Sequence, residues 1–317
     1  MINMKTHIIL LFFIISLPFT SIASNTSFDV GRAGFTVSVK GIKNPYSVFS
    51  VYVLPDETVT LSSEDEFKIR TDQGIIEEKQ ATSWEWKAPS VPGLYPINLQ
   101  TNDNSKNMVL NIFVMRPSKE LKDGKLDGYN IGNYPSKPFK GLPIYGVPKG
   151  FIEVTEQNIN TAISPHFTLG QFLCKQPSTA SKKFLILRPE LLLKLERILQ
   201  EVNKQGYVAN SFFIMSGYRT PFYNNAIGNG KYSRHIYGGA ADIYIDTTPR
   251  DGSMDDLNKD GKINRKDAAV LYDLIEKLSK QEGWKHIGGL GEYGVSHTHG
   301  PFVHVDARGF RARWGKN

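Results

Sequence analysis

Short runs of alternating apolar and polar residues dominate the N-terminal part of the chain. In residues 35–39, Phe35, Val37 and Val39 alternate with two polar residues, which is the period of a half-buried strand. Further strands are expected over residues 48–54, 58–61, 67–70, 84–86, 94–99 and 108–115. Turns containing Pro, Gly or Asp, such as 54–56 and 88–93, separate the runs. Their spacing predicts an immunoglobulin-like β-sandwich over residues 27–115.

A helical period begins in the second half of the chain. Pro189 opens a segment that ends near Gly206 and whose apolar residues recur at helical spacing. These residues are Leu191, Leu192, Leu195, Ile198, Leu199 and Val202. The same patterns predict strands over residues 212–216, 241–245 and 302–307, a loop over 232–239 and a helix over 267–282. The mixed order predicts an α+β domain over residues 151–317, with an antiparallel sheet and flanking helices.

Two segments lie outside these domains. Lys5, the apolar run 8–15 and the small residues Ser21 and Ala23 predict a signal peptide over residues 1–23, cleaved after Ala23. The run is shorter than the roughly 20 apolar residues that span a bilayer, so no stable membrane anchor is expected after cleavage. Residues 116–150 are rich in Gly, Pro, Lys and Tyr and predict an extended connector.

Composition and charge indicate a globular protein that binds anionic partners. With 40% hydrophobic and 22% charged residues, the chain has the composition of a globular protein. Its formal charge of +7 favours anionic partners such as cell-wall polymer, and the absence of any nucleic-acid motif argues against nucleic acid. Cys174 is the single cysteine, so no internal disulfide is expected, and we interpret it as a buried apolar residue. The pattern does not predict an oligomeric state.

Metal-ligating residue types occur at a spacing that suits one site. His235 and Asp242 stand seven residues apart, and Gly238 and Gly239 between them let the backbone turn sharply. Alternation in the last strand sends His304 to the face opposite its two valine neighbours. Two imidazoles and one carboxylate leave a fourth position for water, as expected of catalytic zinc.

Three ordered motifs resemble the zinc D-Ala-D-Ala carboxypeptidase family, whose fold is shared with hedgehog signalling domains. They are the segment 216–221 (SGYRTP), the segment 233–242 (SRHIYGGAAD) and the segment 303–306 (VHVD). The resemblance covers roughly residues 164–314. It implies hydrolysis of peptidoglycan stem peptides, with zinc on His235, Asp242 and His304. It also implies that Arg219 binds a substrate carboxylate, which a planar guanidinium can do through two hydrogen bonds.

The catalytic base is where the chain departs from that family. Many relatives carry an acidic residue three positions before the last zinc histidine and a histidine two before it, whereas this chain has Pro301 and Phe302. The alternatives are His299, His297, Glu292 and Asp306. We favour His299 as the proton shuttle and Asp306 as a carboxylate that orients a zinc-bound imidazole.

Residues 256–267 predict a second metal site. Asp256, Asn258 and Asp260 stand at loop positions 1, 3 and 5, the carbonyl of Lys262 is at position 7, and Asp267 is at position 12. Aspartate at position 12 resembles the calcium loops of dockerins. We expect a structural calcium ion in this insertion, the alternative being a polar turn.

Three functional hypotheses remain open at this stage. The first is a periplasmic or secreted zinc peptidase of the cell envelope, acting as a D-Ala-D-Ala carboxypeptidase or a murein endopeptidase on peptidoglycan peptides. The second is a metal-containing cell-wall binding module without turnover, which the replaced residues at Pro301 and Phe302 favour. The third is adhesion through the β-domain.

Overall fold

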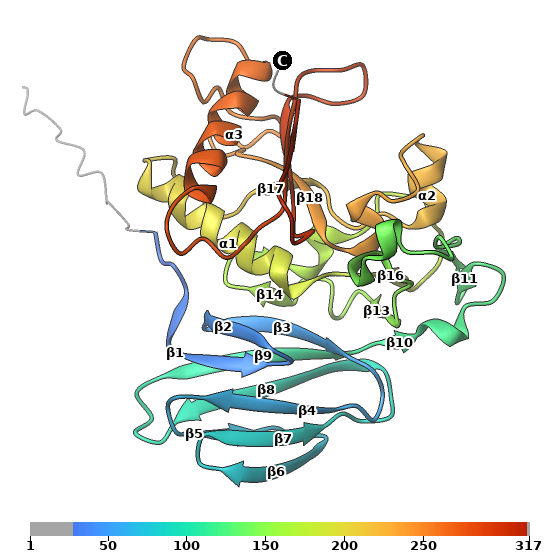
Figure 1. Cartoon of the computed structure of the whole chain (residues 1–317), viewed down its shortest axis with the longest axis vertical. Helices are drawn as coiled ribbons and strands as arrows, with labels where there is room; N and C mark the ends of the chain where they lie inside the picture. Colours follow the sequence, from blue (N-terminus) through green and yellow to red (C-terminus); the bar gives the residue numbers. More distant parts are fainter. Residues whose placement is uncertain (1–27, 316–317) are drawn as a thin grey trace, which may run out of the picture.

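The N-terminal part of the molecule consists of two β-sheets. The computed structural model describes residues 28–315. One sheet has the order β2-β1-β4-β7-β6 and the other the order β3-β9-β8-β5 (Figure 1). The strands are β1 (Arg32–Val39), β2 (Ile42–Tyr46), β3 (Val48–Val53), β4 (Thr58–Ser63), β5 (Phe67–Arg70), β6 (Ile75–Gln80), β7 (Ser83–Lys87), β8 (Gly93–Thr101) and β9 (Asn107–Val114).

Alternation along these strands follows the expected burial. In β1, Phe35, Val37 and Val39 are buried while the residues between them are more exposed. Apolar side chains of both sheets join one buried cluster, which gives the sandwich its core. β3 pairs in parallel with β9, whereas the other strand pairs of the two sheets are antiparallel. Membership of the immunoglobulin-like class stays a prediction.

The predicted connector packs against the C-terminal part. It contains β10 (Arg116–Pro117), η1 (Ser118–Glu120), β11 (Lys125–Leu126), β12 (Tyr129–Asn130), η2 (Phe139–Gly141) and η3 (Pro143–Tyr145). Tyr129 and Ile131 are fully buried in a small cluster with Phe151 and Phe184, which belong to the following strands. Apolar side chains of the connector therefore belong to a core, which the Gly and Pro content of the segment did not reveal.

The C-terminal part has an α+β arrangement built on a mostly antiparallel sheet. The order of that sheet is β17-β18-β20-β19-β21, and β19–β21 is its one parallel pair. The elements are β13 (Gly150–Val154), β14 (Ala162–Ser164), β15 (Phe167–Thr168), η4 (Leu169–Phe172), β16 (Lys183–Leu185), α1 (Pro189–Lys204), β17 (Phe213–Ser216), α2 (Pro221–Ala226), η5 (Arg234–Tyr237), β18 (Ala240–Tyr244), α3 (Arg265–Ser279), β19 (Gly289–Tyr293), β20 (Phe302–Asp306) and β21 (Ala312–Trp314).

Helices α1 and α3 supply most of the helical core. α1 begins at Pro189 and buries Leu191, Leu195 and Val202 along one side, as its apolar spacing predicts. α3 packs against β19, β20 and α1 (Figure 1). Arg265 of α3 bonds Glu292 of β19 at 2.7 Å, which marks the sheet face that α3 covers. The opposite face of β18 and β20 is left for the candidate site.

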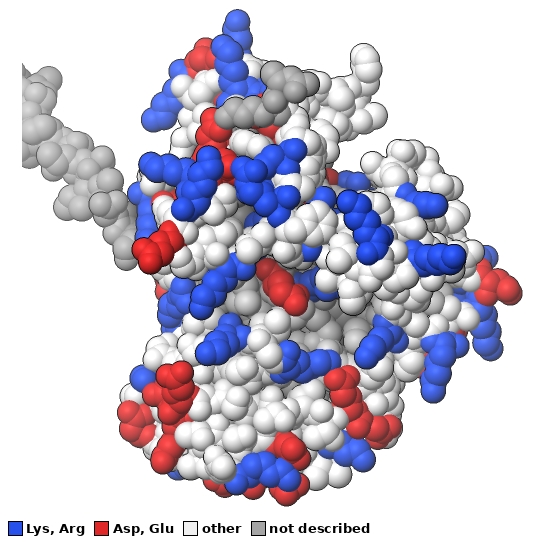
Figure 2. Space-filling model, in the orientation of Figure 1, with Lys and Arg blue, Asp and Glu red and all other residues white. Residues whose placement is uncertain are grey.

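The sandwich and the C-terminal part share one buried cluster. At their junction, the Asn111 side chain donates a hydrogen bond to the carbonyl of Ala162 at 2.8 Å. His166 bonds Glu196 of α1 at 2.7 Å and approaches the carbonyl of Asp29 at 2.9 Å. Lys and Arg side chains gather across the middle of the face shown in Figure 2, where the two parts meet.

The predicted signal peptide over residues 1–23 lies outside the described residues. None of the helices within residues 28–315 combines the length and the apolar character needed to cross a membrane.

Candidate metal centre

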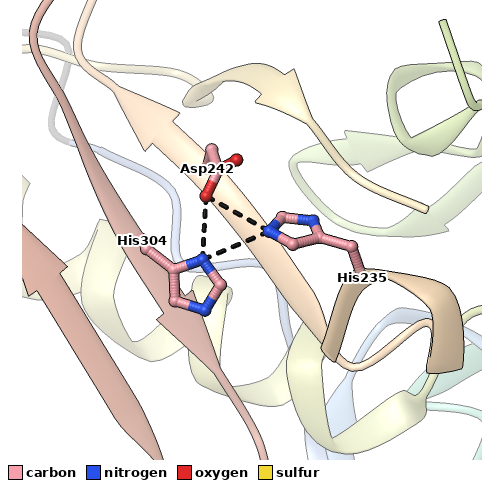
Figure 3. Close-up of side chains that lie close together, drawn as sticks. All are labelled: His235, Asp242 and His304. Atoms are coloured by element: carbon pink, nitrogen blue, oxygen red, sulfur yellow. Dashed lines mark hydrogen bonds and ion pairs between the residues drawn. The ribbon is translucent and has the colours of Figure 1, made fainter. Parts of the chain in front are cut away.

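Three side chains from different elements converge on one point (Figure 3). His235 comes from η5, Asp242 from β18 and His304 from β20, and all three are buried. β18 and β20 are antiparallel neighbours in which Asp242 lies directly opposite His304, so both side chains project from the same face. His304 Nδ1 lies 2.8 Å from Asp242 Oδ1, and His235 Nε2 lies 3.2 Å from that nitrogen.

Two glycines, Gly238 and Gly239, form the turn that connects η5, which carries His235, to β18. Gly238 ends η5 with a φ of 64°, a left-handed conformation that side chains rarely adopt. A Cβ at Gly238 would lie 2.3 Å from the carbonyl oxygen of Ile186, and one at Gly239 would lie 2.7 Å from Arg234 Nη2. The chain therefore needs glycine at Gly238 to pass from η5 into β18, whereas a side chain at Gly239 would meet side-chain atoms of Arg234 and Arg188.

Each imidazole is oriented by a hydrogen bond from its other nitrogen. His235 Nδ1 donates to the carbonyl of Gly217 at 2.7 Å, which leaves Nε2 with a lone pair facing the cluster. His304 Nε2 bonds Asp306 Oδ2 at 3.1 Å, which leaves Nδ1 facing the cluster. Such outer partners typically fix the ring orientation of metal-binding histidines and raise the basicity of the ligand.

The donor set fits zinc. Nitrogen and oxygen ligands bind Zn²⁺ at about 2.0–2.2 Å, which places neighbouring donor atoms about 3.4 Å apart in a tetrahedral site. The three atoms here are 2.8 to 3.3 Å apart. They form the one cluster of three or more His, Cys, Asp or Glu side chains with metal-binding dimensions in residues 28–315. A zinc ion held by these three residues would keep one further position for water or substrate.

Burial and charge set the protonation of the cluster. Burial lowers the pKa of His235, so its imidazole is held neutral, as metal binding requires. Burial also works against a charged Asp242, but His235 and His304 outweigh it and hold the pKa of this carboxyl well below its usual range. Asp242 is therefore an anion ready to bind a cation.

Arg219 lies beside the cluster, and its guanidinium already bonds two residues of the protein. One of its terminal nitrogens bonds Asp242 Oδ2 at 2.5 Å, and its Nε donates to Ser216 Oγ at 2.7 Å. The guanidinium thus stabilises the carboxylate that would bind the metal, in addition to lining the cleft above it.

The two side chains favoured for proton transfer and support lie in different settings. His299 is half-buried, lines the cleft and contacts the ring of Phe302, with a centroid distance of 4.9 Å. Asp306 is fully buried and accepts hydrogen bonds from the N–H of Gly289, from Arg308 and from His304. With its oxygens occupied and closed to solvent, Asp306 can hold His304 but cannot reach a substrate.

The remaining alternatives for the base lie away from the cluster. Glu292 lies opposite Val303 in the β19–β20 pair, so it projects from the face that α3 covers, and it pairs with Arg265 there. His297 is exposed and does not line the cleft. Among the described residues that line the cleft, His299 is the one imidazole outside the metal cluster.

Several residues that line the cleft above the cluster could not be predicted from sequence patterns. The volume of the cleft is about 1060 Å³, and Tyr293, Arg308 and Trp314 belong to its lining. The Trp314 ring lies 5.1 Å from the His304 ring and over Gly291, where a Cβ would approach the indole nitrogen to 2.3 Å. Trp314 reaches the site through the parallel pairing of β21 with β19, a contact between short strands that periodicity does not reveal.

The predicted calcium loop folds as a compact turn in front of α3. The Asp256 carboxylate accepts hydrogen bonds from the N–H groups of Asp260 and Gly261, and the Asp267 carboxylate accepts those of Asn258 and Asn264. Asp267 also forms a capping box with Asn264 at the start of α3. Within residues 28–315, the acidic side chains of this loop form no cluster with the metal-binding dimensions seen at His235. The Lys262 carbonyl accepts a hydrogen bond from the side chain of Asn264.

Cys174 is buried, and its sulfur accepts the N–H of Thr220. Burial raises the pKa of its thiol, which keeps the sulfur protonated and unreactive.

A family model matches part of the chain that contains two of the three ligands. Residues 165–259 match the model of the Peptidase M15 family. The match confirms the resemblance to the zinc D-Ala-D-Ala carboxypeptidases for this part of the chain. The Peptidase M15 segment contains Arg219, His235 and Asp242 and ends before His304, which the β18–β20 pairing brings to the site. No curated protein matches the chain significantly.

Proposed function

We propose that the protein is an exported zinc-dependent peptidase that hydrolyses peptide bonds in peptidoglycan stem peptides. The observation that carries the proposal is the buried cluster of His235, Asp242 and His304 at the wall of a large cleft, within and beside the Peptidase M15 segment. Its reaction would be that of a D-Ala-D-Ala carboxypeptidase or a murein endopeptidase.

The charge of the cleft supports an anionic peptide substrate. Lys175, Arg219 and Arg308 line it, and Asp242 is the one carboxylate among its described lining residues. Stem peptides carry free carboxylates, and a cationic cleft with low-dielectric walls concentrates anions near it. The guanidinium of Arg219 stands closest to the cluster and is suited to bind the carboxylate next to the bond that is cut.

Bound zinc would lower the pKa of a water molecule and polarise the carbonyl of the scissile bond. The residues of the chain supply the remaining functions. Around the metal, His235 and His304 would each present one lone pair, Asp242 would supply the negative charge, and Asp306 would hold the ring of His304 in place. We assign proton transfer to the leaving amine to His299, because its imidazole lines the same cleft.

Digestion of purified peptidoglycan tests the proposal. Zinc-loaded protein is incubated with peptidoglycan, and the released fragments are identified by mass spectrometry. Loss of one D-Ala residue per stem identifies a carboxypeptidase, and cleavage of crosslinks identifies an endopeptidase. Activity must disappear on chelation and return with added zinc. Undiminished cleavage after all zinc has been removed would contradict the mechanism.

A binding module without turnover is the second candidate. The specific observation in its favour is that Pro301 and Phe302 replace the acid and the histidine found before the last ligand in many relatives. Retention on peptidoglycan without any released fragment, under conditions in which a known relative cuts, would favour it over the enzyme.

The cell envelope is the proposed location. The expected leader at residues 1–23 and the basic balance of the chain both support it. Detection of the mature protein outside the cytoplasm, beginning at Ser24, tests this proposal.

We also propose a structural calcium ion in the loop 256–267, on the strength of its ligand spacing. Because the loop leads directly into α3, calcium should raise the melting temperature of the zinc-loaded protein. Asp256→Ala should abolish the increase. An unchanged melting temperature across a calcium titration of the wild-type protein would exclude the site.

A further inference from the structure

A second cavity of about 530 Å³ adjoins the zinc cleft. One wall is the connector around residues 132–137, and the other is α2 with the loop 229–232 that follows it. The connector and α2 lie side by side (Figure 1), because the N–H of Phe222 donates to the carbonyl of Ile131 at 3.0 Å. The volume is typical of a small-molecule site.

The walls of this cavity are held in place by the fold. Gly132 has a φ of 82°, and a Cβ there would lie 2.6 Å from the nitrogen of Phe222, so the two segments are in backbone contact. The hydroxyl of Tyr134 bonds the hydroxyl of Tyr218 at 2.9 Å and the carbonyl of Ile236 at 3.0 Å. The cavity is therefore a preformed feature of the surface.

The cavity and the zinc cleft are neighbours that share lining residues. Tyr232 and Asn229 line both. Tyr232 lies one residue before the zinc motif and bonds the carbonyl of Lys137 across the gap at 3.2 Å. A ligand that fills the zinc cleft and extends past Tyr232 would enter the second cavity.

The lining of the cavity combines amides and aromatic rings without any acidic side chain. Its described polar and aromatic side chains are Asn133, Tyr134, Ser136, Lys137, Phe222, Asn224, Asn225, Asn229, Lys231 and Tyr232. Phe222 is 49% exposed, a high value for a phenylalanine. Amides can both donate and accept hydrogen bonds, and aromatic rings offer flat apolar faces.

One amide has an unsatisfied atom. Asn224 is 2% exposed, and its side-chain nitrogen donates to the carbonyls of Asn229 and Gly230. Its Oδ1 is buried and accepts no hydrogen bond from any residue between 28 and 315. A buried acceptor of this kind is normally satisfied by water or by an N–H of a ligand.

We propose that this cavity binds the N-acetylated glycan to which a stem peptide is attached, so the inference rests on the proposed function. Sugar rings have apolar faces that stack on aromatic side chains such as Phe222. Their hydroxyl and acetamido groups match the asparagine amides that line the cavity. The stem peptide then enters the zinc cleft past Tyr232, and the glycan fixes its register.

The test compares one stem peptide free and attached to an N-acetylglucosamine–N-acetylmuramic acid disaccharide. The expected ratio of kcat/KM, attached over free, is about ten, the equivalent of about 1.4 kcal/mol of added binding. Phe222→Ala should bring this ratio towards one. Val208→Ala, which removes a 78% exposed side chain outside the cavity, should leave the ratio as in the wild type.

A binding measurement separates this inference from the proposed function. The β-1,4-linked tetramer of N-acetylglucosamine is titrated into the zinc-loaded protein by calorimetry. Saturable binding that Phe222→Ala weakens about tenfold supports the glycan site, whether or not either peptide is cut. Failure to cut either peptide would refute the peptidase proposal alone. A wild-type ratio of one, or no saturable binding of the tetramer, overturns the glycan site while leaving peptide cleavage intact.

Discussion

The metal cluster depends on the register of two strands. Asp242 lies opposite His304 because β18 and β20 pair in that register, and a shift by one residue would turn His304 to the face covered by α3. The alternation around His304 predicts from which face of the sheet its side chain projects, and the family motifs identify it as the third ligand. The position of Trp314 beside it could not be predicted, since that contact arises from pairing between distant short strands.

Removal of either histidine should empty the metal site. His235→Ala and His304→Ala each leave two ligands. Loss of a residue that only hydrogen-bonds a ligand typically lowers metal affinity by about 10- to 100-fold, so the loss of a ligand itself should lower the zinc affinity further. Metal analysis after dialysis measures this directly. His297→Ala is the matched control, because His297 is exposed and lies outside the cleft lining. Full zinc occupancy in either of the first two variants would show that the ligand assignment is wrong.

Arg219→Ala should affect the substrate more than the metal. The three ligands remain, so zinc is retained, whereas a charged hydrogen bond to the substrate carboxylate is lost at a cost of about 1.5–3 kcal/mol. The expected result is a rise in KM of about tenfold or more with the metal content preserved. Unchanged KM for peptides with a free carboxylate would assign Arg219 to the support of Asp242 alone.

At the level of elements, regular strands and amphipathic helices could be predicted from the sequence. The range of β5 agrees with the expected residues 67–70, and α1 begins at the proline that marks its first turn. β6 was missed because nearly all of its side chains are exposed, so it has no apolar alternation. β19 has two glycines and no alternation that could reveal its place in the sheet.

The turn between η5 and β18 has the strictest local requirement in the site. Gly238→Ala should lower the free energy of unfolding by more than about 2 kcal/mol, because it adds left-handed strain and a clash with Ile186. Gly228→Ala is the matched control, since its φ is 73° but no atom lies within 4 Å of its Cβ position. Urea unfolding compares the two variants, and equal losses would mean that the close approach to Ile186 carries no cost.

At the level of the whole molecule, the two parts could be predicted but their attachment could not. The sequence separates a β-rich part from a mixed part at the connector. Contacts between distant segments join the two parts, such as Asn111 with Ala162 and His166 with Asp29. No local pattern encodes these contacts.

The junction should weaken as the pH rises. Burial alone would lower the pKa of His166, but its hydrogen bond to the buried Glu196 outweighs this effect and raises the pKa above its ordinary value of about 6.5. A raised folded-state pKa gives stability that is fully present below about pH 6.5 and is lost as the pH rises through the folded-state value. Urea unfolding between pH 6 and 8 should therefore show a decrease in stability in the wild type.

His166→Gln should flatten this pH dependence, whereas His297→Gln should leave it unchanged because His297 is exposed. The same decrease in stability in His166→Gln as in the wild type would show that other groups cause it.

The packing of the connector limits how the chain could be divided. Tyr129 and Ile131 complete the cluster around Phe151 and Phe184, and Tyr145 packs against Tyr237 beside the zinc motif. A fragment beginning at Gly150 would expose the rings of Phe151, Phe184 and Tyr237 to water and would lose a wall of each cavity. Any C-terminal fragment would therefore have to include the connector, and an exchange of the sandwich for another module would have to join the chain before Arg116.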